Sequence, residues 1–364
     1  MKKIIAIIGL ITMTLVANVN AAPVLKTAPV LKESVSKKDA ASVKTQTSKQ
    51  TATSKTAAPA AATASLMNVE STPEEIDSGS VGKGASLSPL LSESFQTDLA
   101  TGSATAGVPI VVPPGRKNMQ PSLGLSYSSN NPDGVCGVGW GLTSSSIQRS
   151  AKKGMPKYDA TDTFVFSSNG SNGDLVLINA VSSEYRQKIE TGFMKYVFDS
   201  ANSKWTVWDK AGVKYTFGSS VASRILNSDG TKTFEWFLDR VEDVYGNVVL
   251  FTYEKDAGQI YLSKVNYTVN DSVAPVFSAD KEVDFVYETG RPDITYNNRT
   301  GWQIATAERL KEVQINVDGA LVWRYALTYI TSSDTNRSLL SQVTLFDASG
   351  NSLPPKKFTY QTIE

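Results

Sequence analysis

Apolar and polar residues alternate with a period of two along most of the chain beyond residue 82. The longest stripe takes every second residue from Leu321 to Tyr329, and shorter stripes begin at Leu123, Val283 and Val313. Successive side chains of a β-strand point to opposite faces, so this pattern places apolar residues on one face of each strand. No stretch beyond residue 82 keeps a helical period. The sequence therefore predicts an all-β fold.

Two kinds of turn separate the predicted strands. Asp-Gly and Asn-Gly dipeptides favour tight hairpins because their central residues take positive φ. They occur at residues 133–134, 169–170, 172–173, 229–230 and 318–319. In the second kind, an Asp accepts amide hydrogens of its own turn and a Gly three residues later supplies a left-handed corner. These turns are Asp209 with Gly212, Asp243 with Gly246 and Asn247, and Asp347 with Gly350. Such turns predict an antiparallel meander of hairpins.

The aromatic residues (6 Trp, 14 Tyr and 13 Phe) all lie at or after Phe95. Large aromatic side chains contribute strongly to protein cores, so we expect the folded domain at residues 81–364. Residues 22–80 are rich in Ala, Thr, Ser and Lys, a composition that cannot bury enough apolar surface to offset the entropy of ordering. This segment is predicted to be a disordered spacer. Its lysines either contact an anionic envelope polymer or, as we prefer, only keep the spacer solvated.

Residues 1–21 have the pattern of a signal peptide. Lys2 and Lys3 precede an apolar run from Ile4 to Val16, and small residues stand before Ala22. This pattern predicts cleavage before Ala22 and a secreted, periplasmic or cell-envelope location. The alternative is an uncleaved membrane anchor, but the apolar run is short for a membrane span.

The composition removes several classes of chemistry. The 36 Lys and Arg balance the 35 Asp and Glu, so no basic field favours nucleic acid as a partner. The chain contains no histidine, which excludes Ser-His-Asp triads and imidazole zinc sites. Cys136 is the single cysteine, so no intrachain disulfide forms, and we interpret it as a small buried hydrophobic residue. No cofactor is expected.

Five acidic residues are candidates for general acid-base work or for a calcium site: Asp159, Asp162, Asp239, Glu242 and Asp243. Their spacing follows turns, in which Asp accepts hydrogen bonds from backbone amides. We therefore favour the structural interpretation, and no catalytic residue and no metal site are predicted.

Glycines surround Trp140 at positions 134, 137, 139 and 141. Their spacing fits neither common phosphate-binding motif, and no helix is predicted after them to bind an anion. We favour close backbone packing at Gly137 and Gly139 around Trp140, which is then a packing anchor.

Several ordered motifs resemble a known family. They are Pro121–Ser129 (PSLGLSYSS), Gly134–Leu142 (GVCGVGWGL) and Trp236–Asn247 (WFLDRVEDVYGN). Over about residues 84–364 the chain resembles the SpvB-type amino-terminal domain of Tc toxin B components and of Rhs (YD-repeat) proteins. The Asp-x-x-Gly-Asn turns are similar to single YD-repeat units.

The resemblance implies a non-enzymatic structural module of an exported toxin. In that family the domain is part of a β-sheet shell that encloses a toxic carboxy-terminal segment. The expected partners are downstream Rhs or propeller segments or other toxin-complex subunits. We accordingly expect a strand around Lys357–Tyr360 at an open face near the chain end. The alternative is a free-standing module that binds glycan or envelope polymer through exposed aromatic rings.

Overall fold

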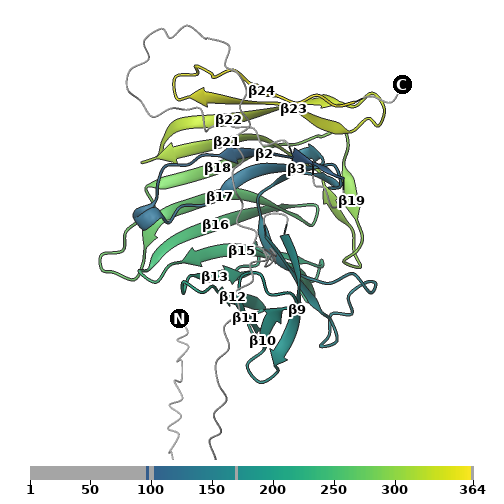
Figure 1. Cartoon of the computed structure of the whole chain (residues 1–364), viewed down its shortest axis with the longest axis vertical. Coiled ribbons are helices and arrows are strands. Elements are labelled where there is room, and N and C mark those ends of the chain that lie inside the picture. The colour runs from purple at the N-terminus through teal and green to yellow at the C-terminus, as the bar shows by residue number, and fades with distance from the viewer. Residues whose placement is uncertain (1–95, 98–101, 169–170, 362–364) are drawn as a thin grey trace, which may run out of the picture. The chain divides into compact units, whose positions relative to one another are not determined.

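The computed structural model describes residues 96–97, 102–168 and 171–361 (Figure 1). The predicted signal peptide at 1–21, the predicted spacer at 22–80 and the dipeptide at 169–170 lie outside the described residues. Within the described ranges, the regular elements are strands, apart from one short 3₁₀ helix, η2 (Arg116–Asn118). Every strand pairing there is antiparallel. The predicted all-β meander is confirmed.

Eight strands form a closed ring at one end of this domain. Strand β15 pairs with β7 through Glu235–Phe237 and with β13 through Leu238–Glu242. Because β7 to β13 also pair in sequence, β15 closes the circle. The ring strands are β7 (Ser145–Arg149), β8 (Phe164–Ser168), β9 (Ser171–Asn179), β10 (Glu184–Gln187), β11 (Lys195–Asp199), β12 (Lys204–Trp208), β13 (Lys214–Phe217) and β15 (Thr233–Glu242). Strand β14 (Arg224–Leu226) pairs with the first half of β15, outside the ring.

Aromatic side chains fill the ring, as expected for a closed sheet of eight strands, whose interior is just wide enough for side chains. Trp205 and Trp236 are fully buried. The phenyl group of Phe164 meets the Trp205 indole edge-on, and the centroids of the two aromatic groups are 4.9 Å apart. The indole Nε1 of Trp236 donates a hydrogen bond to the Ser203 carbonyl at 2.7 Å. Edge-to-face aromatic pairs of this kind add about 0.5–1.5 kcal/mol to the gain from burial.

A large sheet continues from the second half of β15. Its strands are β16 (Asn247–Asp256), β17 (Gln259–Asn270), β18 (Lys281–Glu288), β21 (Arg309–Val317), β22 (Ala320–Thr331), β23 (Ser338–Asp347) and β24 (Lys356–Lys357). The predicted alternation is realised in it: Val313 and Ile315 of β21 and Tyr325 and Leu327 of β22 are buried. Two short pairs flank it, β4 (Asp133–Gly134) with β5 (Gly137–Val138) and β19 (Thr295–Asn297) with β20 (Ile304–Thr306).

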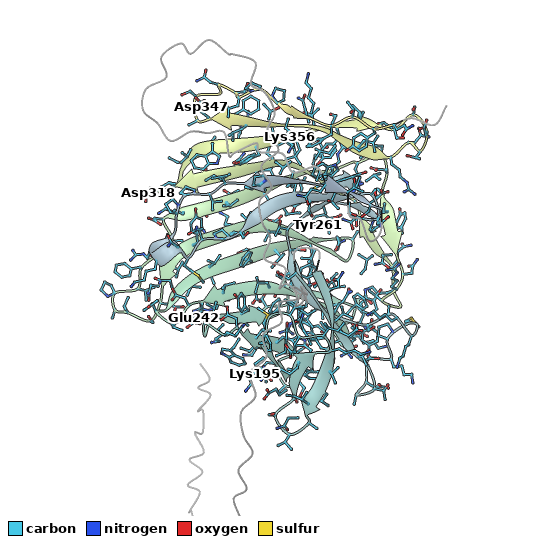
Figure 2. All side chains as sticks on the ribbon, viewed as in Figure 1. Lys195, Glu242, Tyr261, Asp318, Asp347 and Lys356 are labelled. Carbon is cyan, nitrogen blue, oxygen red and sulfur yellow. The ribbon has the colours of Figure 1, made fainter. Side chains whose placement is uncertain are left out.

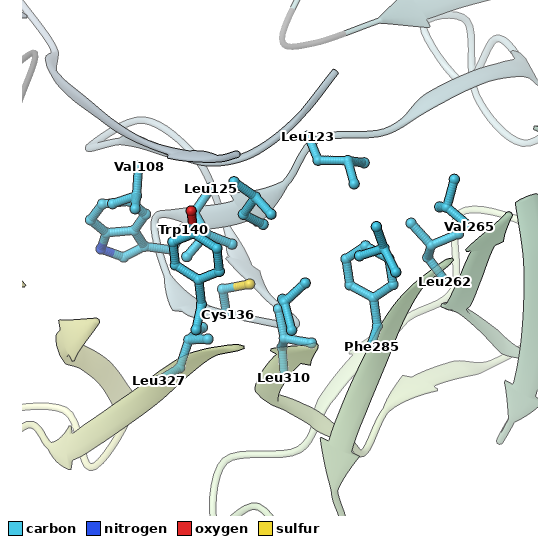
Figure 3. Close-up of a cluster of buried hydrophobic side chains, with 14 of the residues drawn as sticks. Val108, Leu123, Leu125, Cys136, Trp140, Leu262, Val265, Phe285, Leu310 and Leu327 are labelled. Carbon is cyan, nitrogen blue, oxygen red and sulfur yellow. The ribbon is translucent and has the colours of Figure 1, made fainter. Parts of the chain in front are cut away.

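A small sheet packs on the large one. It contains β1 (Gln96–Thr97), β2 (Ala104–Ile110), β3 (Leu123–Ser128) and β6 (Trp140–Leu142). Val108 and Leu125 of this sheet share one buried cluster with Phe285 and Leu310 of the large sheet (Figure 3). Hydrogen bonds also join the layers: the Val111 amide donates to the Tyr325 hydroxyl at 3.0 Å. The two layers therefore enclose the main core.

Two predicted turns are strands instead. Asn172 and Gly173 lie within β9, paired with β8. A Cβ on Gly173 would stand 2.7 Å from the Gln187 amide nitrogen, so the glycine permits a close approach rather than a turn. Asp133–Gly134 forms β4, and the chain reverses after it, before β5. Asp318 and Gly319 do form the predicted hairpin turn, with φ of 51° and 75° (Figure 2).

The strand expected at Lys357–Tyr360 is shorter and begins earlier. Strand β24 covers Lys356–Lys357 and pairs with Gln342 and Val343 of β23, at the outer edge of the large sheet. Beyond it, the Phe358 amide still bonds to the Ser341 carbonyl, and no strand pairing continues to Tyr360. The ring of Phe358 packs against Trp140, and the Tyr360 hydroxyl accepts a hydrogen bond from its indole. The last residue, Glu364, expected at this open face, lies outside the described residues.

Candidate functional site

Trp140 is the centre of a packed aromatic cluster. It starts β6, is 2% exposed, and lies 5.3 Å from the Tyr127 ring and 4.6 Å from the Phe358 ring. Its indole Nε1 donates to the Tyr360 hydroxyl at 2.9 Å, and this hydroxyl donates to the Leu340 carbonyl at 2.8 Å. Trp140 thus connects the small sheet to the last described strands of the large sheet.

The glycines before Trp140 allow close backbone contacts. Gly137 has φ of 86°, and a Cβ there would lie 2.5 Å from the Ser338 carbonyl oxygen. Gly139 has φ of 74°, and its Cβ would stand 2.5 Å from the Tyr127 ring. Gly141 differs, since nothing lies within 4 Å of a Cβ built on it. A strand, β6, follows this segment, so the backbone offers no helix amino terminus for a phosphate.

Cys136 lies in the same region and is fully buried in the main core (Figure 3). Burial raises the pKa of its thiol to about 12, although the charge of Arg291 lowers it. A thiol with such a pKa stays protonated at neutral pH and is a poor nucleophile. The side chain therefore acts as a small apolar group.

The three Asp-x-x-Gly turns share one geometry. In the turn after β15, Asp243 Oδ1 accepts the amides of Tyr245 and Asn247, both at 2.8 Å. The turn after β23 repeats this arrangement: Asp347 Oδ1 accepts the amides of residues 349 and 351 at 2.9 and 2.8 Å. In the turn after β12, Asp209 Oδ1 accepts the amides of residues 211 and 213 at 2.9 and 3.0 Å. Their glycines, Gly212, Gly246 and Gly350, have φ between 77° and 86°.

The other candidate carboxylates are also committed to structural bonds. Asp159 accepts the Thr161 amide at 2.8 Å, and Asp162 pairs with Arg149 at 2.7 Å. Asp239 Oδ2 accepts two hydroxyl and two amide hydrogens from Ser219, Ser220 and Ser223 in the loop between β13 and β14. Glu242 lies 3.3 Å from Arg240. In the described ranges no group of three or more acidic or thiol side chains is arranged to hold a metal ion.

Sequence reasoning missed Glu235 of β15. Burial raises the pKa of its carboxyl to about 7, although a hydrogen bond from the Ser146 hydroxyl at 2.6 Å lowers it. The residue lies on the wall of a cavity of about 210 Å³ together with Arg149 and Arg299. The alternation of apolar and polar residues along β15 did not predict this environment of Glu235. Such alternation cannot show that β7 and β14 flank the position on its two sides.

The raised pKa predicts a pH-dependent stability. Between about pH 4.5 and pH 7 the unfolded chain ionises Glu235 while the folded chain keeps it neutral. The free energy of unfolding should therefore fall over this window, by up to about 3 kcal/mol, and level off above it. Glu235→Gln should remove this fall, whereas Glu254→Gln, at an exposed position, should retain it. Urea unfolding at a series of pH values measures both; equal profiles for the two variants would contradict the prediction.

Comparison with known sequences gives one family. The family model described as "Salmonella virulence plasmid 65kDa B protein", SpvB, matches residues 98–312. The mono(ADP-ribosyl)transferase SpvB of Salmonella choleraesuis strain SC-B67 is 26% identical over 222 residues, which are 49% of this chain and 36% of the relative. The protein of the same name from Salmonella typhimurium strain 14028s is 25% identical over the same shares. The chain thus spans little more than a third of these relatives.

Solved structures share the fold. The crystal structure of TcdB2-TccC3 matches with a TM-score of 0.66 and 21% identity, over 80% of this chain and 18% of that one. The Photorhabdus luminescens Tc holotoxin pore gives 0.65 and 22%, over 74% and 16%. The N-terminal domain of effector protein SpvB from Salmonella typhimurium strain LT2 gives 0.56 and 18%, over 66% and 98%. The predicted likeness to Tc shell sheets is confirmed at the level of the fold.

Proposed function

The chain belongs to the family of the Salmonella virulence plasmid 65 kDa B protein, SpvB, and we propose that its folded domain is a non-enzymatic structural module of an exported Tc-like or Rhs-like toxin. The module contributes to a β-sheet shell that encloses or docks a toxic segment. The observation that carries the proposal is the large antiparallel sheet, which it shares in fold with the TcdB2-TccC3 chain.

Two features support a structural role over an enzymatic one. Asp159 accepts a hydrogen bond within its own loop, and Asp162 pairs with Arg149 of β7. The Oδ2 atom of Asp239 accepts hydrogen bonds from the loop between β13 and β14. The matched part of the curated transferases is 36% of their length, so their printed activity does not extend to this domain by similarity alone. The signal-peptide pattern of residues 1–21 supports the proposed export.

The edge of the large sheet is the proposed contact with further shell segments. Strand β24 pairs with β23 on one side, and the Phe358 amide donates to the Ser341 carbonyl at 2.8 Å. Hydrogen bonding alternates along an antiparallel strand, so the amide of the preceding residue, Lys357, points away from β23. An outward row of backbone groups is a template for a further strand.

We therefore expect the purified chain to associate through this edge. On size exclusion with light scattering it should form concentration-dependent oligomers, or a stable complex with a co-expressed Rhs-repeat segment from the same genome. Lys357→Pro removes the outward amide and should abolish association, whereas Lys357→Ala keeps it and should not. A chain that stays monomeric and does not bind the Rhs segment would contradict the proposal. Binding of that monomer to isolated envelope glycans would then favour the free-standing module.

In the part of the chain that the structure describes, no helix is both long and apolar enough to cross a bilayer.

A further inference from the structure

A cavity of about 640 Å³ lies where the ring meets the two packed sheets. Phe166 and Phe217 line it from the ring, Leu123 from the small sheet and Tyr261 from the large sheet. Tyr261 is labelled in Figure 2 and is 2% exposed. Ligand pockets in proteins typically have volumes of about 300–1,000 Å³ and mostly apolar, aromatic walls. The volume and the lining of this cavity fall in that class.

The tyrosines of the cavity offer rings rather than free hydroxyls. The hydroxyl of Tyr253 donates to the Leu238 carbonyl at 2.5 Å, and that of Tyr287 donates to the Leu262 carbonyl at 3.0 Å. The hydroxyl of Tyr261 accepts the amide of residue 307 at 3.0 Å. Each of these polar ends already has a partner in the fold, so the walls favour an apolar or aromatic body.

One residue that lines the cavity has a buried polar atom without such a partner. Asp133 of β4 lines the cavity, and its side chain is 5% exposed. Its Oδ2 lies 3.5 Å from the Arg337 Nε, but its Oδ1 is buried without a hydrogen-bond partner among the described residues. The nearby Arg291 is engaged by Asp293 and the Gly134 carbonyl. A buried carboxylate oxygen without a donor is costly, and a donor brought by a ligand would remove this cost.

We propose that this cavity binds a small amphipathic amine, with an aromatic or aliphatic body between the ring and the sheets and a protonated nitrogen that donates to Asp133. Charge complementarity selects the cationic head, because a carboxylate ligand would meet Asp133 with like charge. The apolar and aromatic walls of the cavity favour the apolar body of such a ligand. The site is separate from the sheet edge at β24. Ligand binding there is a property beyond the proposed shell function.

The test uses three probes that share one body: naphthylmethylamine, naphthalenemethanol and naphthoate. Calorimetric titration of the purified chain should show saturable binding in the order amine, alcohol, carboxylate, with the amine about tenfold or more tighter than the alcohol. Asp133→Asn should bring the amine and the alcohol to within about twofold, since a carboxamide has no charge to pair. Equal affinity of the amine and the alcohol for the unchanged chain would overturn the assignment of the head group.

A second variant tests the cavity itself. Gly141 lines it, has no positive φ, and leaves open space where a Cβ would stand. Gly141→Leu should fill part of the cavity and weaken all three probes together, with the circular dichroism spectrum unchanged. Asp229→Asn, in a turn outside the cavity lining, should bind as the unchanged chain does. Probe binding that survives Gly141→Leu and Asp133→Asn alike would place the binding elsewhere and refute the proposal.

Discussion

Replacing Trp140 by alanine should lower the free energy of unfolding by about 3–5 kcal/mol, the range for truncating a fully buried aromatic side chain. The residue is 2% exposed and contacts the rings of Tyr127 and Phe358. Its removal leaves a cavity between the small sheet and the end of the large sheet. It also deprives the Tyr360 hydroxyl of its indole donor. Urea unfolding followed by circular dichroism measures the loss.

A matched variant separates packing from hydrogen bonding at this position. Trp140→Phe keeps an aromatic ring but cannot donate to Tyr360, so it should cost less than Trp140→Ala. Tyr360→Phe should cost about 1 kcal/mol, the usual net value of one hydrogen bond. If Trp140→Ala cost less than about 1 kcal/mol, the surroundings would have to collapse freely, and Trp140 would not be a packing anchor.

The sequence was sufficient for the parts of this fold that depend on neighbours along the chain. The stripes at Val313 and Tyr325 predicted the buried faces of β21 and β22, and Asp318 predicted the turn between them. Side-chain alternation and turn chemistry are both local, so a single sequence records them. The Asp-x-x-Gly turns belong to this class, because every hydrogen bond of the Asp243 carboxylate lies within five residues.

Features that depend on distant pairing were not predictable in this way. Closure of the ring requires β15 to meet β7, about 90 residues earlier, as well as β13. Strand alternation shows which side chains share a face, but it does not show which strand lies alongside. The same limit explains Gly173, which has the sequence of a turn but pairs with Phe166 of β8 inside β9, where the absence of a Cβ permits the close approach of Gln187. It also explains why the partly buried environment of Glu235 and its raised pKa were missed.

A buried ion pair holds three distant segments together near Trp140. The Arg291 guanidinium is fully buried, bonds both carboxylate oxygens of Asp293 at 3.0 and 3.1 Å, and donates to the Gly134 carbonyl at 3.0 Å. Asp293 in turn accepts the amide and the hydroxyl of Ser338, at the start of β23. Burial alone would raise the pKa of Asp293, but Arg291 and Ser338 hold it at about 2. This pair thus fixes the loop before β19 to β4 and β23.

Arg291→Met should lower the free energy of unfolding by about 3–5 kcal/mol, because it leaves Asp293 as an uncompensated charge in a buried site. Adding Asp293→Asn to that variant should restore part of the loss, since the second change removes the stranded charge. In the unchanged chain, the contribution of Asp293 should be complete above about pH 4 and disappear as the pH falls towards 2, because its folded pKa lies below its unfolded value. Urea unfolding of the single and double variants, at pH 7 and at pH 3, measures these effects. A double variant less stable than Arg291→Met alone would show that Asp293 stabilises the fold through Ser338 and not through the ion pair.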